Sequence, residues 1–344
     1  MRRGAIIGLG NVALEVHVPA FARRDDVAIV AVTDTDRARR RVAEASLPAA
    51  RWYDSADELL THEPLDFVDI CTPPSSHGPL TCRALERGLH VFCEKPLVVS
   101  RDELDRVTAL AEATRHVVHT VHNWRHAPII QRATELVREG MIGHVRRVVW
   151  RTLRTRAAAA AGNGNGTNWR LDPALAGGGI LTDHGWHAFY LLGGWLDDAP
   201  TSLRARVEQR RAGASGVEDT ATVEMTFPGA TAEIFLTWAA DRRDNVAEIV
   251  GTDGRIELHG ETLALERNGR VQRWTCPPAL SNGSVHPDWF DPEVAEFLDA
   301  LARTPPRSNL TEAWLCGVLE SAARESSRRG GEPLAVPAPR LPRA

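Results

Sequence analysis

Residues 5–13 read Ala-Ile-Ile-Gly-Leu-Gly-Asn-Val-Ala, so a short apolar run leads directly into a GxGxxA pattern. The apolar run predicts a β-strand. In this pattern Gly8 makes a tight turn, Gly10 lets the backbone approach a pyrophosphate, and the small Ala13 allows a helix to pack closely on the strand. Residues 16–24 are compatible with that helix. The stretch therefore predicts the start of a dinucleotide-binding Rossmann fold.

A second apolar run covers residues 27–32, and Asp34 follows it. In a Rossmann fold an acid at this place accepts hydrogen bonds from ribose hydroxyls and repels a 2′-phosphate, which favours NAD over NADP. A plain helix N-cap is the alternative role for Asp34. Because four arginines lie close behind, at positions 37, 39, 40 and 41, the use of NADP stays open.

Strands and helices keep alternating through the first part of the chain. Further strand-like runs lie at residues 67–71, 91–93 and 117–121, and helix-compatible stretches lie at residues 39–45, 56–60, 80–87 and 102–114. This alternation predicts a doubly wound parallel sheet of the α/β class.

The loop after residues 67–71 is predicted to be rigid, because Pro73 and Pro74 would break any strand. It lies at the carboxyl edge of the sheet, where ligands bind in such folds. We therefore expect Thr72 and Pro73 to contact the cofactor. His77 is included with them, although a hydrogen-bonding role within the loop suits it equally well.

Lys95, in the sequence Cys93-Glu94-Lys95-Pro96, is the only lysine among 41 Lys and Arg residues. It follows an apolar run at residues 89–93 and so sits at the end of a predicted strand. Arg cannot take its place where a proton must leave, because guanidinium stays protonated. A surface cation is the simpler interpretation, but the position at a strand end makes Lys95 the first candidate for catalysis.

The composition is that of an ordinary globular chain. Its 344 residues are 43% hydrophobic and 25% charged with a net charge of −4, so the overall charge does not indicate nucleic-acid binding. No apolar run reaches the roughly 18 residues of a membrane span, and the strand-like N-terminus does not resemble a signal peptide. Five cysteines without CxxC pairs are expected to be reduced, which predicts a cytoplasmic protein.

The second half predicts a different architecture. The expected elements are a helix at 129–139, a strand at 145–150, a low-complexity surface loop at 157–166, seven strand-like runs between 202 and 275, and helices at 292–302 and 311–324. Hairpin signals such as Asp253-Gly254 and Asn268-Gly269 separate the strands. This pattern predicts an antiparallel sheet with helices on one face.

Asp183 and His187 form the next pair of candidates. Three glycines at 177–179 precede a predicted helix at 180–192, and residues four apart in a helix share one face. An acid beside an imidazole fixes its tautomer and raises its basicity, as proton transfer with a hydroxyl requires. His184 is expected to face elsewhere. The pair also matches part of a metal site, but without a third ligand no metal is predicted.

Trp169 and Arg170 are candidates for one wall of a substrate pocket, in which Arg170 would hold hydroxyls or a carboxylate. A plain packing pair explains them equally well. Farther along, His286 begins the sequence His-Pro-Asp-Trp and is expected near the mouth of the site.

Several motifs occur in an order known from one enzyme family. They are GLGNVA at 8–13, CTPPSSH at 71–77, Glu-Lys-Pro at 94–96, Asn123 with Arg125, and Asp-x-Gly-x-His at 183–187. Over nearly its whole length the chain resembles the Gfo/Idh/MocA family of glucose–fructose oxidoreductase, inositol dehydrogenase and rhizopine-catabolism proteins. The resemblance implies a Rossmann domain at residues 1–122, an α+β substrate-binding domain with an open, mainly antiparallel sheet at 123–330, and an extended tail at 331–344. It also implies a homodimer or homotetramer formed through that sheet.

The residue pattern and the resemblance together predict the site. The catalytic residues are expected to be Lys95, Asp183 and His187. The cofactor is expected to contact Gly8, Gly10, Asn11, Val12, Asp34, Thr72, Pro73, His77, Glu94, Lys95 and Asn123. The substrate is expected to contact Lys95, Arg125, Trp169, Arg170, Asp183 and His187. The chain departs from the family at Ala13, where Ala replaces Gly, and at His126, where an aromatic residue is common.

The predicted function is NAD-dependent hydride transfer to or from a secondary alcohol of a sugar, cyclitol or related polyol, with Lys95 and His187 as acid–base groups. One alternative is a redox-neutral reaction with bound NAD, such as epimerisation or glycoside cleavage. Another is the reduction of a C=O or C=N group in a biosynthetic pathway. An NAD-sensing scaffold is the non-enzymatic alternative, although it would not need Lys95, Asp183 and His187 together.

Overall fold

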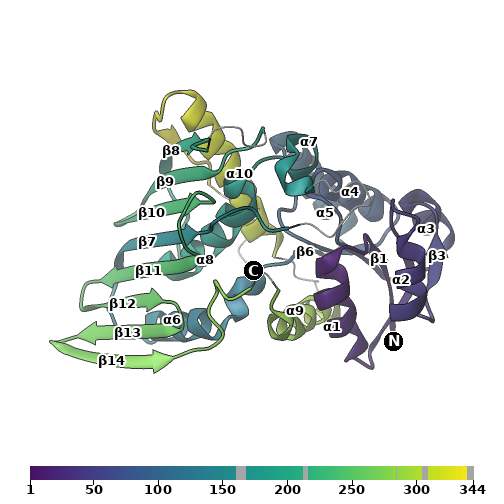
Figure 1. The fold of residues 1–344 in the computed structure, drawn as a ribbon, viewed down its shortest axis with the longest axis horizontal. Coiled ribbons are helices and arrows are strands. Elements are labelled where there is room, and N and C mark those ends of the chain that lie inside the picture. Colours follow the sequence, from purple (N-terminus) through teal and green to yellow (C-terminus); the bar gives the residue numbers. More distant parts are fainter. Residues whose placement is uncertain (160–167, 212–215, 284, 304–308, 339–344) are drawn as a thin grey trace.

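The computed structural model covers residues 1–344 and describes all of them except 160–167, 212–215, 284, 304–308 and 339–344. Most of the predicted low-complexity loop at 157–166 lies outside the described residues. Two β-sheets stand side by side, with helices around and between them (Figure 1). Among the described helices, none is long and apolar enough to cross a membrane.

The six-stranded sheet has the order β3-β2-β1-β4-β5-β6, and every neighbouring pair is parallel. Its strands are β1 (Arg2–Ile7), β2 (Val27–Thr33), β3 (Arg51–Tyr53), β4 (Phe67–Ile70), β5 (His90–Cys93) and β6 (Val118–Thr120). Its helices are α1 (Val18–Ala22), α2 (Arg39–Ser46), α3 (Ala56–His62), α4 (His77–Glu86) and α5 (Arg101–Thr114). This strand order is that of the Rossmann fold, so the predicted fold class is confirmed.

The nine-stranded sheet has the order β14-β13-β12-β11-β7-β10-β9-β8-β15. Its strands are β7 (Val145–Leu153), β8 (Ser202–Glu208), β9 (Thr220–Phe227), β10 (Ala230–Thr237), β11 (Asp244–Gly251), β12 (Gly254–His259), β13 (Thr262–Arg267), β14 (Arg270–Thr275) and β15 (Leu334–Ala335). β7 lies between β10 and β11 and is parallel to β10, whereas the other neighbours are antiparallel. The sheet is thus mixed but mainly antiparallel, as predicted. Part of the predicted tail forms the short strand β15.

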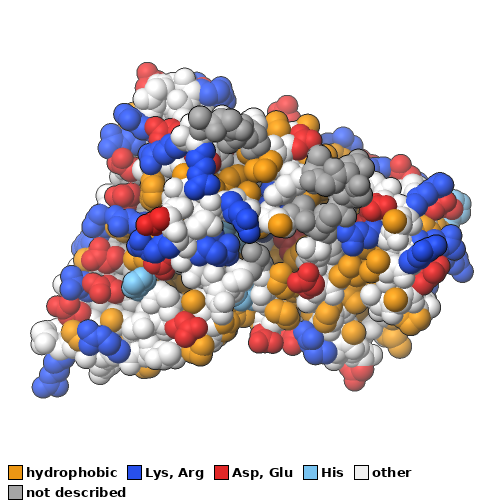
Figure 2. Space-filling view, viewed as in Figure 1, with side chains coloured by type: hydrophobic (Ala, Val, Ile, Leu, Met, Phe, Trp, Pro, Cys, Tyr) orange, Lys and Arg blue, Asp and Glu red, His pale blue; other side chains and the backbone are white. Residues whose placement is uncertain are grey.

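Helices cover one face of this sheet. They are α6 (Pro128–Arg138), α8 (Trp186–Leu196) and α10 (Leu310–Arg328), while the short α7 (Pro173–Ala176) lies toward the first sheet. The other face carries charged rows, in which Arg147 lies 3.8 Å from Glu233 and 3.7 Å from Glu248 on the neighbouring strands. Figure 2 shows basic and acidic side chains interspersed over this part of the molecule, at left.

Helix α9 (Phe290–Ala302) packs on the first sheet although it lies far along the chain. The ring of Phe297 stacks 5.0 Å from that of Phe92 in β5. On the same helix the fully buried Glu293 lies 3.1 Å from Nε2 of His119 in β6. Figure 1 shows α9 beside α1, on the side of the six-stranded sheet. A segment that the sequence groups with the second half therefore completes the core of the first.

Candidate active site

A cavity of about 720 Å³ lies at the carboxyl edge of the six-stranded sheet. It runs from the ends of β1 and β2, past the loops after β4 and β5, to residues that follow β7 and β10 in the other sheet. Its size is that of a small-molecule site. Both halves of the chain therefore contribute to one site.

The predicted cofactor contacts lie in the wall of this cavity, with one exception. All of them except His77 line it: Gly8, Gly10, Asn11, Val12, Asp34, Thr72, Pro73, Glu94, Lys95 and Asn123. Gly8 has a φ of +96°, and a Cβ there would lie 2.9 Å from the carbonyl group of Cys71, so a side chain would clash. A Cβ on Gly10 would meet nothing within 4 Å, which leaves room for a phosphate against the backbone. These glycines fit a dinucleotide.

The carboxylate of Asp34 is fixed at the end of β2. It accepts hydrogen bonds from the backbone N–H groups of Leu9, at 2.7 Å, and Asp36, at 2.8 Å. Arg39 lines the same end of the cavity. The acid thus stands where a ribose diol would reach it, with one arginine close by.

His77 does not line the cavity, so the structure does not support its predicted contact with the cofactor. Its ring is buried, with Nδ1 2.7 Å from the carbonyl oxygen of Pro96 and Nε2 2.7 Å from that of Thr72. Because it starts α4 beneath both loops, the imidazole points away from the cavity and joins the loop after β4 to the loop after β5. This is the hydrogen-bonding role given above as the alternative.

A buried cluster of His17, Asp69 and Cys71 contacts Glu94, which lines the cavity. His17 lies with Nδ1 2.9 Å from Oδ2 of Asp69 and with Nε2 3.1 Å from Oε1 of Glu94. Burial lowers the pKa of His17, but Asp69 and Cys71 together outweigh it and raise the pKa well above its ordinary value. His17, Asp69 and Cys71 are close enough to hold a metal ion, yet burial raises the pKa of the thiol and Nδ1 already faces Asp69. We interpret the cluster as a support for Glu94.

Lys95 and Asp183 meet in the middle of the cavity. The Nζ of Lys95 donates to the backbone oxygen of Asp183 at 2.7 Å and to its Oδ1 at 3.1 Å, and each side chain is 16% exposed. Burial raises the pKa of Asp183, but Lys95 and His184 outweigh it and hold the pKa well below its usual range. A charged pair therefore spans the two halves of the chain.

Asp183 does not orient His187, contrary to the prediction from their spacing. Residues Leu181–Gly185 form a π-helical turn before α8, so the regular α-helical spacing assumed for the pair does not apply there. Oδ2 of Asp183 lies 3.2 Å from Nδ1 of His184, and no hydrogen bond joins Asp183 to His187 in the described part of the chain. His184, which was expected to face elsewhere, lines the cavity.

His187 is instead held by Tyr190 and Trp124. Its Nδ1 lies 2.8 Å from the hydroxyl oxygen of Tyr190, which also accepts a hydrogen bond from the backbone N–H of Trp124 at 3.0 Å. The His187 ring stacks on the indole of Trp124 at 4.2 Å with an interplanar angle of 5°. Burial, followed by the charge of Lys95, lowers the pKa of His187 well below its ordinary value. The ring is therefore neutral near pH 7, and Nε2 makes no hydrogen bond to any described residue.

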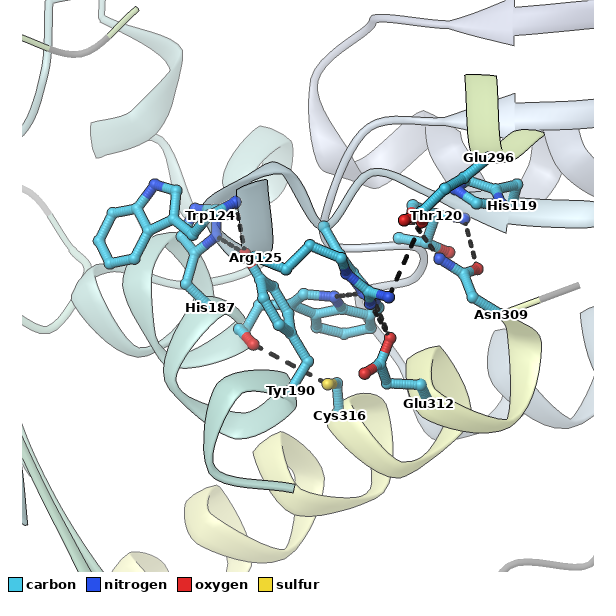
Figure 3. Close-up of polar contacts among 12 residues, drawn as sticks. His119, Thr120, Trp124, Arg125, His187, Tyr190, Glu296, Asn309, Glu312 and Cys316 are labelled. Carbon is cyan, nitrogen blue, oxygen red and sulfur yellow. Dashed lines mark hydrogen bonds and ion pairs between the residues drawn. The ribbon is translucent and has the colours of Figure 1, made fainter. Parts of the chain in front are cut away.

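Arg125 does not line the cavity, so the structure does not support its predicted contact with the substrate. Figure 3 shows its side chain pointing to Glu312 on α10, away from the stacked rings of Trp124 and His187. Residues Asn123–His126 form a tight turn, which sends the side chains at 124 and 125 in different directions. Burial raises the pKa of Glu312, but Arg125 outweighs it and lowers the pKa to about 2. The contact is an ion pair between two elements of the fold.

Trp169 and Arg170 line the cavity as predicted, with the Arg170 guanidinium 4.2 Å from the centre of the Trp169 ring. His286 also lines it, as expected for the mouth of the site. Residues that the sequence did not indicate complete the wall: Trp124, Arg154, Thr182, Trp238 and Arg243. Arg154 follows β7, Trp238 follows β10 and Arg243 precedes β11, so the order of these strands in the second sheet brings the three residues to the cavity.

Comparison with known proteins agrees with this architecture. Residues 2–122 match the family described as "Oxidoreductase family, NAD-binding Rossmann fold", and residues 130–257 match the "GFO/IDH/MocA C-terminal domain". D-apiose dehydrogenase of Paraburkholderia graminis is 29% identical over 294 residues, which cover 82% of this chain and 75% of that protein. D-glucoside 3-dehydrogenase of Escherichia coli is 35% identical over 196 residues, which cover 56% of this chain and 54% of that protein.

A solved structure gives the same fold over almost the whole chain. The aldose–aldose oxidoreductase from Caulobacter crescentus complexed with glycerol superposes with a TM-score of 0.82 at 22% identity, covering 97% of this chain and 99% of that one. Together the two family matches span most of the sequence. The chain belongs to the Gfo/Idh/MocA family of NAD-dependent oxidoreductases.

Proposed function

We propose that the chain oxidises a secondary alcohol of a sugar, cyclitol or related polyol with NAD, or reduces the matching ketone with NADH. The observation that carries the proposal is that Lys95 and a neutral His187 line the same cavity as the dinucleotide site. The named activities of the relatives, on D-apiose and on D-glucosides, support a sugar-like substrate.

Bound nicotinamide would accept or supply the hydride. In the oxidation direction, Nε2 of the neutral His187 takes the hydroxyl proton. Lys95 donates from Nζ to the same oxygen and stabilises the negative charge that develops there. Asp183 aims Lys95 through its two acceptor oxygens. Tyr190 holds Nδ1 of His187, which leaves Nε2 directed at the substrate.

The test follows NADH by its ultraviolet absorbance, with purified protein, NAD and a panel of sugars, inositols and other polyols. A rise with one member supports the reaction and identifies the substrate. In Lys95→Met and His187→Gln variants we expect the rate to fall at least about 100-fold, because positioned acid–base groups contribute roughly 10²–10⁴-fold. Arg138→Gln, at an exposed position at the end of α6, is the matched control and should keep full activity. Turnover retained by Lys95→Met would contradict the proposed mechanism.

The same panel separates the alternatives. Conversion of a sugar without net NADH, by protein that keeps NAD bound, would indicate a redox-neutral reaction. Turnover only with an activated C=O or C=N compound would indicate a biosynthetic reductase. NAD binding without any turnover would favour a sensing scaffold. A parallel series with NADP measures the preference that Asp34 is expected to set.

We also propose that the outer face of the nine-stranded sheet joins copies of the chain into a homodimer or homotetramer. The support is that Val149 and Phe235 interrupt the charged rows on this face. A Phe235→Glu variant should then sediment as a monomer, and an unchanged mass would contradict the proposal. The buried thiols of the five free cysteines suit the reducing cytoplasm, where we place the protein.

A further inference from the structure

We propose that the substrate carries an anionic group, either a carboxylate or a phosphate, and that Arg154 and Arg243 bind this group inside the cavity. The inference rests on the proposed function and narrows its substrate class to sugar acids or sugar phosphates. It comes from a comparison of arginines that are partly or fully buried.

Two of these arginines are fully paired with acids. Arg125 forms its ion pair with Glu312. Arg324 on α10 lies 2.9 Å from Glu218 and 3.2 Å from Glu320. Such pairing is the normal condition for a charged side chain withdrawn from solvent.

Arg154 is more deeply buried and has no such partner. It is 3% exposed and donates to the backbone oxygens of Leu153, at 2.8 Å, and Asp244, at 2.9 Å, and to Oδ1 of Asn245 at 2.8 Å. In the described part of the chain no carboxylate forms an ion pair with it, and the segments outside the described residues contain no Asp or Glu. A buried guanidinium held only by neutral acceptors carries a free-energy cost that a counter-ion would offset.

The pKa values also distinguish Arg154 from the paired Arg125 and Arg324. Burial, then the charge of Arg243, lowers the pKa of Arg154 to about 10. For Arg125 and Arg324 burial acts in the same direction, but the neighbouring carboxylates outweigh it and raise the pKa. Arg154 is therefore incompletely compensated by the protein itself.

Arg154 lines the cavity beside Arg243, whose hydrogen bonds also go to neutral acceptors. Arg243 donates to the backbone oxygens of Ser281, at 3.2 Å, and Gly283, at 2.6 Å. Lys95 in the same cavity is already paired with Asp183. The guanidiniums of Arg154 and Arg243 can therefore bind a negatively charged group that enters the cavity.

Burial and the charges of Arg154 and Arg243 lower the pKa values of two histidines that line the cavity. Burial, followed by the charges of Arg154 and Arg243, lowers the pKa of His286 to about 4. The charge of Arg154 also contributes to the low pKa of His184, which touches Asp183. Both imidazoles line the cavity. The two arginines therefore line the same cavity as the acid–base groups Lys95 and His187.

The chemistry of guanidinium defines the class of ligand. Its planar fork matches two oxygens of a carboxylate or a phosphate, and such charge-assisted bonds are stronger than those to neutral hydroxyls. A neutral polyol would leave the charge of Arg154 uncompensated. A substrate with one anionic end and a secondary alcohol near His187 would satisfy both parts of the cavity.

The first experiment probes the anion site without a substrate. Thermal unfolding of the NAD-loaded protein is measured in sulfate and in chloride at equal ionic strength, for the wild type, Arg154→Gln, Arg243→Gln and the control Arg138→Gln. We expect sulfate to raise the melting temperature of the wild type and the control in a saturable way, and the effect to disappear in the two cavity variants. Equal stabilisation by chloride, or an unchanged sulfate effect in both cavity variants, would overturn the proposal.

The second experiment uses matched substrates. Binding and NADH formation are compared for D-glucose, D-glucuronate and D-glucose 6-phosphate, and for their galacto epimers. We expect an anionic member to bind at least about tenfold more tightly than its neutral partner, and Arg154→Gln to remove that difference. A neutral sugar that is preferred, or a preference that survives in both cavity variants, refutes the inference.

Three further outcomes have defined meanings. If Arg154→Gln does not fold, the exposed Arg243 carries the test through its own variant. If both variants weaken NAD binding alone by the same factor as anion binding, the guanidiniums serve the pyrophosphate of the cofactor and the inference is wrong. If no sugar forms NADH, the proposed function fails, whereas the sulfate measurement still decides on the anion site.

Discussion

The Lys95→Met variant is expected to lose stability at neutral pH by an amount that shrinks as the pH falls. Methionine keeps the length of the side chain but removes the charge that lies 3.1 Å from Oδ1 of Asp183. Removing one member of a buried ion pair costs about 3–5 kcal/mol. Because each side chain is 16% exposed, we take the low end and expect about 3 kcal/mol.

The sign of the pH dependence follows from proton linkage. In the wild type the folded-state pKa of Asp183 is depressed, so its stabilising contribution is present above the unfolded pKa and is lost as the pH falls through the folded pKa. Without Lys95, burial remains and the folded-state pKa rises. The charge of Lys95 also contributes to the low pKa of His184, so this pKa rises as well. The folded variant then binds more protons than the folded wild type, and the difference in stability narrows in acid.

The assay is urea denaturation of both proteins at about pH 8 and about pH 5. Lys95→Met with Asp183→Asn serves as the control, because the double variant has no unpaired carboxylate and should recover most of the lost stability. A deficit that stays constant or grows toward acid pH would refute the reasoning. A double variant as unstable as the single one would refute it too.

Three further outcomes are expected. In Tyr190→Phe, His187 loses the partner of Nδ1 while its stacking on Trp124 remains, so kcat should fall about tenfold with KM for NAD unchanged; steady-state kinetics checks this. The rate of alcohol oxidation should stay flat from about pH 8 down to about pH 6, because the pKa of His187 is lowered by burial and the base stays neutral; a pH–rate profile that declines through this range would contradict it. In Asp34→Ser the ratio of kcat/KM for NAD to that for NADP should fall at least about tenfold, because the repulsion of a 2′-phosphate is lost while Arg39 stays beside it; an unchanged ratio would show that Asp34 only caps backbone N–H groups.

The fold and the site could be predicted best at positions where the residue type itself indicates a specific structural or chemical role. Gly8 has a positive φ, and Gly10 leaves open space for a phosphate beside the backbone. The turn after β1 could therefore be predicted from these two glycines. The alternation of strands and helices was enough to predict a parallel, doubly wound first sheet, although the strand order and β3 were not predicted. Lys95 stood out because the chain uses arginine everywhere else. These features depend on local geometry or on composition, which a sequence displays directly.

The errors arose where tertiary structure overrides local spacing. The spacing of Asp183 and His187 indicates a hydrogen-bonded pair, but Asp183 contacts His184 and His187 contacts Tyr190 instead. Arg125 and His77 have side chains suited to an active site, yet both make structural contacts instead. Arg125 pairs with Glu312 on α10, and His77 hydrogen-bonds to the backbone oxygen of Pro96. No periodicity reveals such a partner.

The wall of the cavity formed by the second sheet could not be predicted for a similar reason. Arg154 follows β7 and Trp238 follows β10, and these strands are neighbours only because β7 inserts in parallel orientation beside β10. Hairpin signals predict antiparallel neighbours along the chain and give no information on such an insertion. The residues therefore become visible as a group only in the folded chain.

The packing of α9 on the first sheet also determines when that sheet can finish folding during synthesis. Phe92 is made early, whereas its stacking partner Phe297 emerges from the ribosome much later. At about 5–20 residues per second, the interval between residues 122 and 302 is roughly 10–40 s. Throughout this time the nucleotide-binding half has an apolar wall without its cover. The core of the six-stranded sheet therefore stays incomplete until α9 has been synthesised, and a fragment that stops at residue 122 would lack this helix.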